Sequence, residues 1–184
     1  MLLGPLEAQP IASGSLDVLA LMDVMEHLPD PLATMGHGLK LLKSDGVAIV
    51  QTPAYPEGVS HEQLTARDDY FLNHLRGKHE EHLFLFSRRS AREFFARLGC
   101  GFLEFEPAIF PQYDMYFVVS RVEPRRSSAE EIDAALESTP SGRLVQALLA
   151  TARQRDYYLQ EATARMKVIE TLAAEVERLR GGSA

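Results

Sequence analysis

A strand–helix–strand pattern near the start of the chain limits its fold more than any other feature. Residues 16–22 and 47–50 are short apolar runs, which are typical of parallel strands covered on both faces. Between them, Asp30 as N-cap and Pro31 in the first turn predict a helix that continues to about residue 43. A tight turn is expected at 44–46, and the apolar face of the helix should comprise Leu32, Met35, Leu39 and Leu42. The short connections predict an open α/β sheet.

A second helix and an antiparallel strand pair are predicted further along the chain. The helix should begin at Ser87 or Ser90 and end at Gly99. Strands are expected at 102–106 and 113–121. Only about seven residues separate them, and a parallel crossover needs a dozen or more. The two strands are therefore expected to pair antiparallel.

The polar segment 123–128 divides the chain into two predicted parts, residues 1–124 and residues 125–184. The second part should contain a helix at 129–138 and, after the break at 140–142, one long helix to about residue 180.

A coiled coil is predicted over about residues 143–180. Its last two heptads have a good apolar seam, formed by Ile169, Leu172, Val176 and Leu179. Arg155 and Arg165 occupy inward positions, so the earlier heptads are poor. We expect an oligomerising or interdomain helix; the alternative is a helix packed on its own domain.

Composition excludes several classes of protein. The net charge of −7 argues against generic binding to nucleic-acid phosphates. Cys100 is the single cysteine, so a disulfide framework and a thiolate zinc site are excluded. No apolar run approaches the ~20 residues that span a bilayer, and the start does not resemble a signal peptide. A cytoplasmic protein with no membrane or nucleic-acid partner is expected.

Several segments, in order, resemble class I S-adenosylmethionine-dependent methyltransferases. Residues 17–31 (Asp-Val-Leu-Ala-Leu-Met-Asp-Val-Met-Glu-His-Leu-Pro-Asp-Pro) resemble that family's fourth strand and its exit loop. Leu41-Leu-Lys-Ser-Asp-Gly46 resembles the turn into strand five, and residues 81–99 resemble the segment before the final hairpin. The resemblance covers about residues 7–121. It implies an α/β, Rossmann-like sheet with strands 4-5-7-6, the final strand antiparallel, followed here by the helical extension.

The family's glycine-rich cofactor loop and the acidic residue after its second strand have no counterpart in this sequence. The edge of the strand at 16–22, which pairs with strand one in the family, is therefore expected to be bare, and bare edges invite pairing. Three explanations are open. The chain is a truncated product or a fragment of a longer gene, or the edge is covered by self-association, or residues 1–15 or a partner cover it. Alone, the chain is expected to bind the cofactor weakly or not at all.

The resemblance also implies site residues. Met22, Asp23 and Val24 are expected to line the pocket for the cofactor S-adenosylmethionine; the alternative is two core residues and a loop cap. In some relatives an acidic-x-x-Glu-His arrangement contacts substrate or binds a divalent ion, and Asp23, Glu26 and His27 have that spacing. His27 is expected in the active site, and no metal is assigned. The alternative is that Glu26 caps a turn and His27 packs against it.

A second polar cluster lies at the end of the segment 53–81, which is predicted to be a surface loop or a lid. The cluster comprises His79, Glu80, Glu81 and His82. The resemblance places His82 at the lip of the pocket, so His82 joins His27 as a candidate catalytic residue; the alternative is a solvated charge run. Tyr113, Asp114 and Tyr116 are expected to face the same cleft or to serve packing.

The resemblance implies transfer of a methyl group to a small-molecule or sugar-like acceptor. The alternative is a non-catalytic, methyltransferase-derived scaffold or dimerisation module that acts through its helical tail. A nucleotide-binding α/β domain of another kind is a third possibility. A homodimer is expected through the C-terminal helix or through the exposed strand edge.

Overall fold

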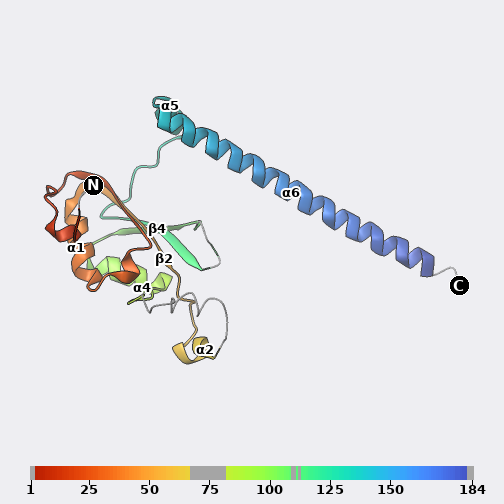
Figure 1. Ribbon diagram of the computed structural model, residues 1–184, viewed down its shortest axis with the longest axis horizontal. Coiled ribbons are helices and arrows are strands. Elements are labelled where there is room, and N and C mark those ends of the chain that lie inside the picture. Colours follow the sequence, from red (N-terminus) through yellow and green to blue (C-terminus); the bar gives the residue numbers. More distant parts are fainter. Residues whose placement is uncertain (1–2, 67–81, 109–110, 112, 182–184) are drawn as a thin grey trace. The chain divides into compact units, whose positions relative to one another are not determined.

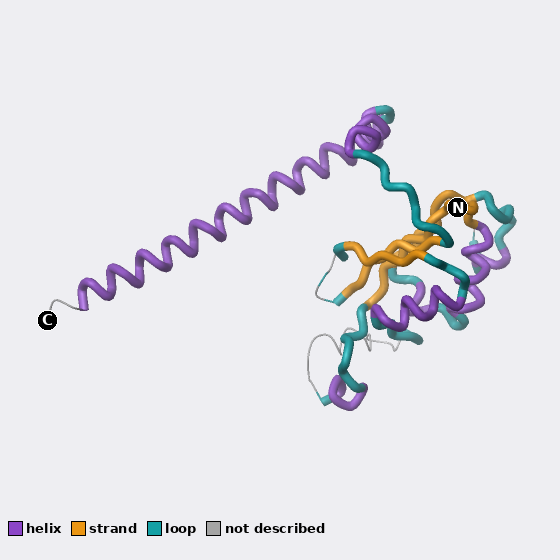
Figure 2. Tube along the Cα trace, turned by 180° about the vertical axis from the view of Figure 1, so that it is seen from behind, coloured by secondary structure: helices purple, strands orange, loops and turns teal. Residues whose placement is uncertain are grey.

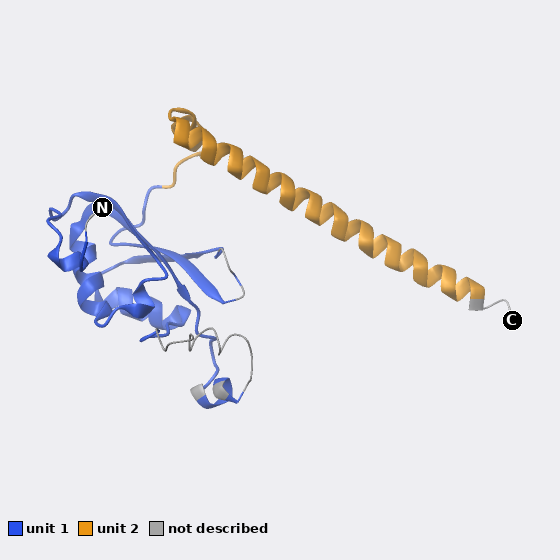
Figure 3. Cartoon of the chain, in the orientation of Figure 1, with its two compact units in different colours: residues 1–125 blue, residues 126–184 orange. Residues whose placement is uncertain are grey.

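The computed structural model describes residues 3–66, 82–108, 111 and 113–181 (Figure 1). The chain divides into two compact units, Met1–Arg125 and Arg126–Ala184 (Figure 3). The first unit carries the sheet and the second consists of helices.

Within the described residues, the first unit is built on a four-stranded mixed sheet with the order β1-β2-β4-β3. Its strands are β1 (Leu16–Met22), β2 (Leu42–Pro53), β3 (Phe102–Glu106) and β4 (Asp114–Ser120). β1 is parallel to β2, and β4 is antiparallel to both β2 and β3. This confirms the predicted order 4-5-7-6 with an antiparallel final strand.

The two helices predicted in the first unit begin where the sequence predicts. In α1 (Pro31–Leu41) the Asp30 side chain accepts a 2.9 Å hydrogen bond from the Ala33 amide. α4 (Arg88–Arg97) begins with a capping box between Ser87 and Ser90, and Gly99 follows it with φ of 79°. Shorter helices are the 3-10 turns η1 (Leu6–Ala8) and η2 (Met25–His27), and α2 (His61–Thr65).

The predicted turn at 44–46 is wrong, because these residues lie inside β2. Leu16 of β1 pairs with Leu42 of β2, and the next pair is Val18 with Val47, so β2 has more residues than β1 between these two pairs. The extra residues of β2 are therefore accommodated as an irregularity within the ladder. α1 consequently ends at Leu41 rather than near residue 43.

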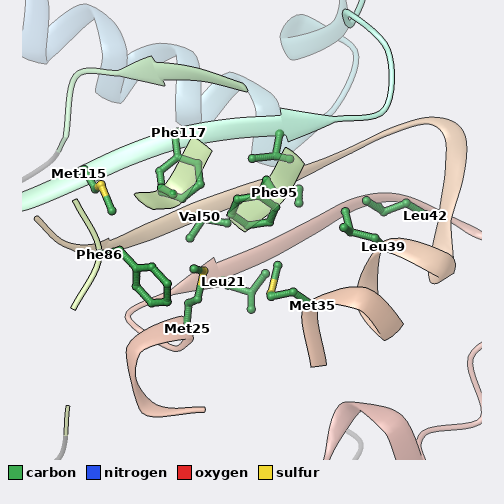
Figure 4. Close-up of a cluster of buried hydrophobic side chains, with 13 residues drawn as sticks. Leu21, Met25, Met35, Leu39, Leu42, Val50, Phe86, Phe95, Met115 and Phe117 are labelled. Carbon is green, nitrogen blue, oxygen red and sulfur yellow. The ribbon is translucent and has the colours of Figure 1, made fainter. Parts of the chain in front are cut away.

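The core lies on one face of the sheet, where α1 and α4 pack (Figures 2 and 4). α1 contributes Met35 and Leu39, α4 contributes Phe95, and the central strands contribute Val50 and Phe117. Leu32, which was expected on the buried face of α1, is exposed. The buried positions of α1 include Pro31, Met35 and Leu39, so the packed face runs through Pro31 and Leu32 lies beside it.

β1 is not covered on both faces as predicted. Leu21 is buried on the side of the helices, whereas Val18 is 49% exposed and Met22 is 41% exposed. Successive side chains of a strand point to opposite faces, and no described helix of this unit packs on the face that carries Val18 and Met22. β1 is also an edge of the described sheet.

The second unit is a helical hairpin of α5 (Ala129–Glu137) and α6 (Pro140–Gly181), a helix of 42 residues. The expected break at 140–142 is wrong, because α6 begins at Pro140. Gly142 allows the close approach to α5, since a Cβ there would lie 2.1 Å from the Leu136 carbonyl oxygen. No described helix combines the length and the apolar character needed to cross a bilayer.

Candidate functional site

The loop after β1 turns sharply at Asp23. Its φ of 53° lies in the left-handed region, which non-glycine residues seldom adopt and in which Asn, Asp and His are enriched. The Asp23 amide donates a 3.1 Å hydrogen bond to the Gln51 carbonyl oxygen of β2. The turn thereby places η2 beyond the carboxyl end of β1, next to the end of the parallel strand β2.

Glu26 of η2 is the central buried charge of this region, with 1% of its surface exposed. Thr52 of β2 donates a 3.0 Å hydrogen bond from Oγ1 to Oε2 of the Glu26 carboxylate. The backbone carbonyl of Glu26 accepts hydrogen bonds from the amides of Leu83, at 2.8 Å, and Phe84, at 3.1 Å. Among the described residues, Oε1 of Glu26 has no hydrogen-bond partner.

The segment whose amides bond the Glu26 carbonyl begins with His82. These hydrogen bonds place His82 beside His27. The centroids of the two imidazole rings lie 4.7 Å apart at an interplanar angle of 48°. One potential ligand atom from each of Glu26, His27 and His82 lies within 4.8 Å of the other two. Two half-buried imidazoles beside a buried carboxylate can bind a metal ion or accept and donate protons.

A polar network adjoins this cluster on the sheet. Gln51 donates from Nε2 to Oδ1 of Asp23, at 3.3 Å, and to Oδ2 of Asp114, at 3.2 Å. Gln51 and Asp114 are buried, so the network ties the Asp23 turn to β2 and β4. Gln51 and Thr52 are not among the site residues predicted from the sequence. Their signal is two polar residues directly after the apolar run at 47–50.

The structure brings the candidate catalytic residues together. His27 and His82 are neighbours, and Asp114 joins Asp23 through Gln51. Met22 and Val24 are exposed, so the alternative that they are core residues is wrong. Glu26 bonds Thr52 and does not cap η2, whose N-cap is Val24 with no side-chain cap.

Two further sequence candidates, Tyr113 and Tyr116, are among the described residues. Tyr113 and Tyr116 are half-buried at the end of the sheet near Asp114. His79, Glu80 and Glu81 lie outside the described residues.

Burial raises the pKa of Glu26, and the hydrogen bond from Thr52 only partly offsets this. The folded state therefore holds the Glu26 proton more tightly than the unfolded chain does. The resulting stability is fully present below the ordinary carboxyl pKa and is lost as the pH rises through the raised value.

Replacing Glu26 by Gln should therefore stabilise the protein at pH 7 in a chelating buffer. The neutral amide removes a buried charge whose Oε1 is unsatisfied, a cost of about 1–3 kcal/mol. The gain should shrink as the pH falls to 4, where the native carboxyl is protonated. Urea denaturation at both pH values measures it, with the exposed Glu106→Gln as control. A gain that is the same at both pH values would contradict the assignment to charge.

A family model described as a methyltransferase domain matches residues 7–104. No curated protein matches the sequence. Similar solved chains include one from the complex between the Haloferax volcanii Trm112 methyltransferase activator and a methyltransferase, with 19% identity and a TM-score of 0.47. This match covers 67% of the present chain and 61% of the solved one.

Two further solved structures are similar. A SAM-dependent methyltransferase from Thermotoga maritima has 13% identity and a TM-score of 0.46, with 63% of this chain and 61% of that chain covered. A structure described as a sarcosine dimethylglycine methyltransferase from Galdieria sulphuraria has 12% identity and a TM-score of 0.47, with 66% and 59% covered. The chain thus spans about three fifths of the length of these solved chains. Because the family model covers more than half of the chain, this protein belongs to the class I S-adenosylmethionine-dependent methyltransferases.

Proposed function

We propose that the chain takes part in the transfer of a methyl group from S-adenosylmethionine to a small-molecule or sugar-like acceptor. One observation carries this: the cluster of Glu26, His27 and His82 lies beyond the carboxyl end of β1 and contacts the end of β2. Ligands of open α/β sheets bind outside the carboxyl ends of parallel strands.

The loop after β1 supplies the proposed cofactor contacts. Met22 and Val24 present exposed apolar side chains at this end of the sheet, which suit the methionine and adenine parts of the cofactor. Asp23 is held in its turn by β2. When bound, the cofactor would supply an electrophilic methyl group on a sulfonium.

His27 and His82 are the proposed acid–base residues. An acceptor hydroxyl or amine must lose a proton as it gains the methyl group, and a neutral imidazole within hydrogen-bond reach can accept it. Glu26, fixed by Thr52 and by the amides of Leu83 and Phe84, holds the two histidine-bearing segments together. Holding catalytic groups in a fixed geometry lowers the entropic part of the activation barrier.

Calorimetry with S-adenosylhomocysteine tests the cofactor assignment on the full chain. We expect weak, saturable binding in the millimolar range, near −4 kcal/mol. Val24→Asp, which places a charge on the proposed contact surface, should weaken it about tenfold, the equivalent of about 1.4 kcal/mol. Val122→Asp is the matched control, since Val122 is also exposed but follows β4. Absent binding, or equal effects of the two variants, would refute the assignment.

Assembly through α6 is a second candidate function, and a specific observation favours it. The four seam residues of its last two heptads are all exposed within the described chain: Ile169, Leu172, Val176 and Leu179. A helix with such an unburied stripe gains stability by packing it against another helix. The proposal is that a second copy of this chain supplies that helix.

A further inference from the structure

We infer that Glu26, His27 and His82 form a binding site for a divalent transition-metal ion such as Zn²⁺ or Mn²⁺. The site uses the same two histidines as the proposed methyl transfer but does not depend on that activity; while they bind an ion, these imidazoles cannot also act as the proposed bases. It is assembled from two segments distant in sequence: η2 supplies Glu26 and His27, and the segment before α4 supplies His82.

The burial and incomplete hydrogen bonding of the Glu26 carboxylate indicate that a ligand binds here. It is 1% exposed, only its Oε2 is held by Thr52, and Oε1 lacks a hydrogen-bond partner among the described residues. A buried carboxylate that is only partly compensated is costly, and buried charges are normally paired or coordinate metals. A cation bound beside Glu26 would remove this cost.

The donor set fits a transition metal. Imidazole nitrogen suits Zn²⁺ and related ions, and carboxylate oxygen also suits Mn²⁺. Three protein ligands leave a position for water or a substrate oxygen, as in catalytic zinc sites. The three donor atoms lie within 4.8 Å of one another. Metal–ligand bonds of about 2.0–2.2 Å then require only a modest closure by the two half-buried imidazoles.

The surrounding contacts are those of a supported metal site. The Thr52 hydroxyl orients the carboxylate, as outer-shell hydrogen bonds orient ligands in metalloproteins. The amides of Leu83 and Phe84 bond the Glu26 carbonyl, so the residues that follow His82 are anchored to the helix that carries the other two ligands.

Titration of the untagged, chelator-treated full chain with Co²⁺ tests the inference by visible absorption, and calorimetry with Zn²⁺ measures affinity. We expect one equivalent of each ion and a cobalt spectrum with no sulfur charge-transfer band. Glu26→Gln and His82→Gln should abolish stoichiometric binding. Thr52→Val should weaken it about 10–100-fold, the usual effect of losing an outer-shell partner.

His37→Gln is the matched control, because His37 is a half-buried histidine on α1 and should leave binding unchanged. Circular dichroism establishes that each variant is folded. No saturable uptake by the wild type, wild-type affinity in Glu26→Gln or His82→Gln, or a thiolate band from Cys100 would overturn the inference. Binding of S-adenosylhomocysteine in chelating buffer, measured separately, distinguishes its failure from that of the proposed methyl transfer.

Discussion

Phe117→Ala is expected to lower the free energy of unfolding of the first unit by about 3–5 kcal/mol, the usual cost of removing a buried phenylalanine ring. Phe117 is fully buried in β4 and lies opposite Val50 of β2. Its ring packs edge-on against Phe95 of α4, with the ring centroids 5.7 Å apart. The centroid of the Phe105 ring of β3 lies 5.4 Å away. It therefore joins three strands and a helix, and few neighbours can relax into the cavity.

Hydrogen exchange of the slowest amides in β2 and β4 measures this loss in the full chain. These amides report the unfolding of the first unit alone, without a contribution from α6. A native stability of about 5–15 kcal/mol would leave the variant marginal or unfolded. Phe117→Leu, which keeps most of the volume, should cost less than about 1.5 kcal/mol and keeps the measurement possible.

Phe84→Ala is the control for Phe117→Ala. Phe84 is 39% exposed, so its removal should cost about 1 kcal/mol or less. Equal losses of unfolding free energy in Phe84→Ala and Phe117→Ala would contradict this prediction. They would show that the packed rings of Phe95, Phe105 and Phe117 are not the centre of the core.

The double variant Leu172→Glu/Val176→Glu is expected to convert an assembled chain into a monomer. These two residues are adjacent seam positions of α6, and both are exposed in the single chain. Association would bury them, and a carboxylate there would have to be desolvated at a cost greater than the gain from packing. Sedimentation equilibrium of the full chain measures the change in mass.

Thr171→Glu/Ala174→Glu is the matched control for the seam variant. It adds the same charge to the same two turns of α6, at positions off the seam. Its oligomeric state should equal that of the wild type. A monomeric wild type, or identical behaviour of the two double variants, would refute association through the seam.

The local parts of this fold were predictable from the sequence because their signals are local. Asp30 followed by Pro31 marks a helix start, and Ser87 followed by Ser90 marks another. The short link between β3 and β4 excludes a parallel pair. The burial of β1 was not predictable, because an apolar run is the same whether one face is covered or two.

The sequence by itself determined the order of strands and helices, their caps and the family to which they point. Only the tertiary structure decided that His82 lies beside His27 and that Glu26 is buried between Thr52 and the segment after His82. Periodicity reports which face of an element is apolar, but not which distant segment covers it. That depends on packing across the sheet, where the turn at Asp23 and the carbonyl of Glu26 bring residues 23–27 and 82–84 together.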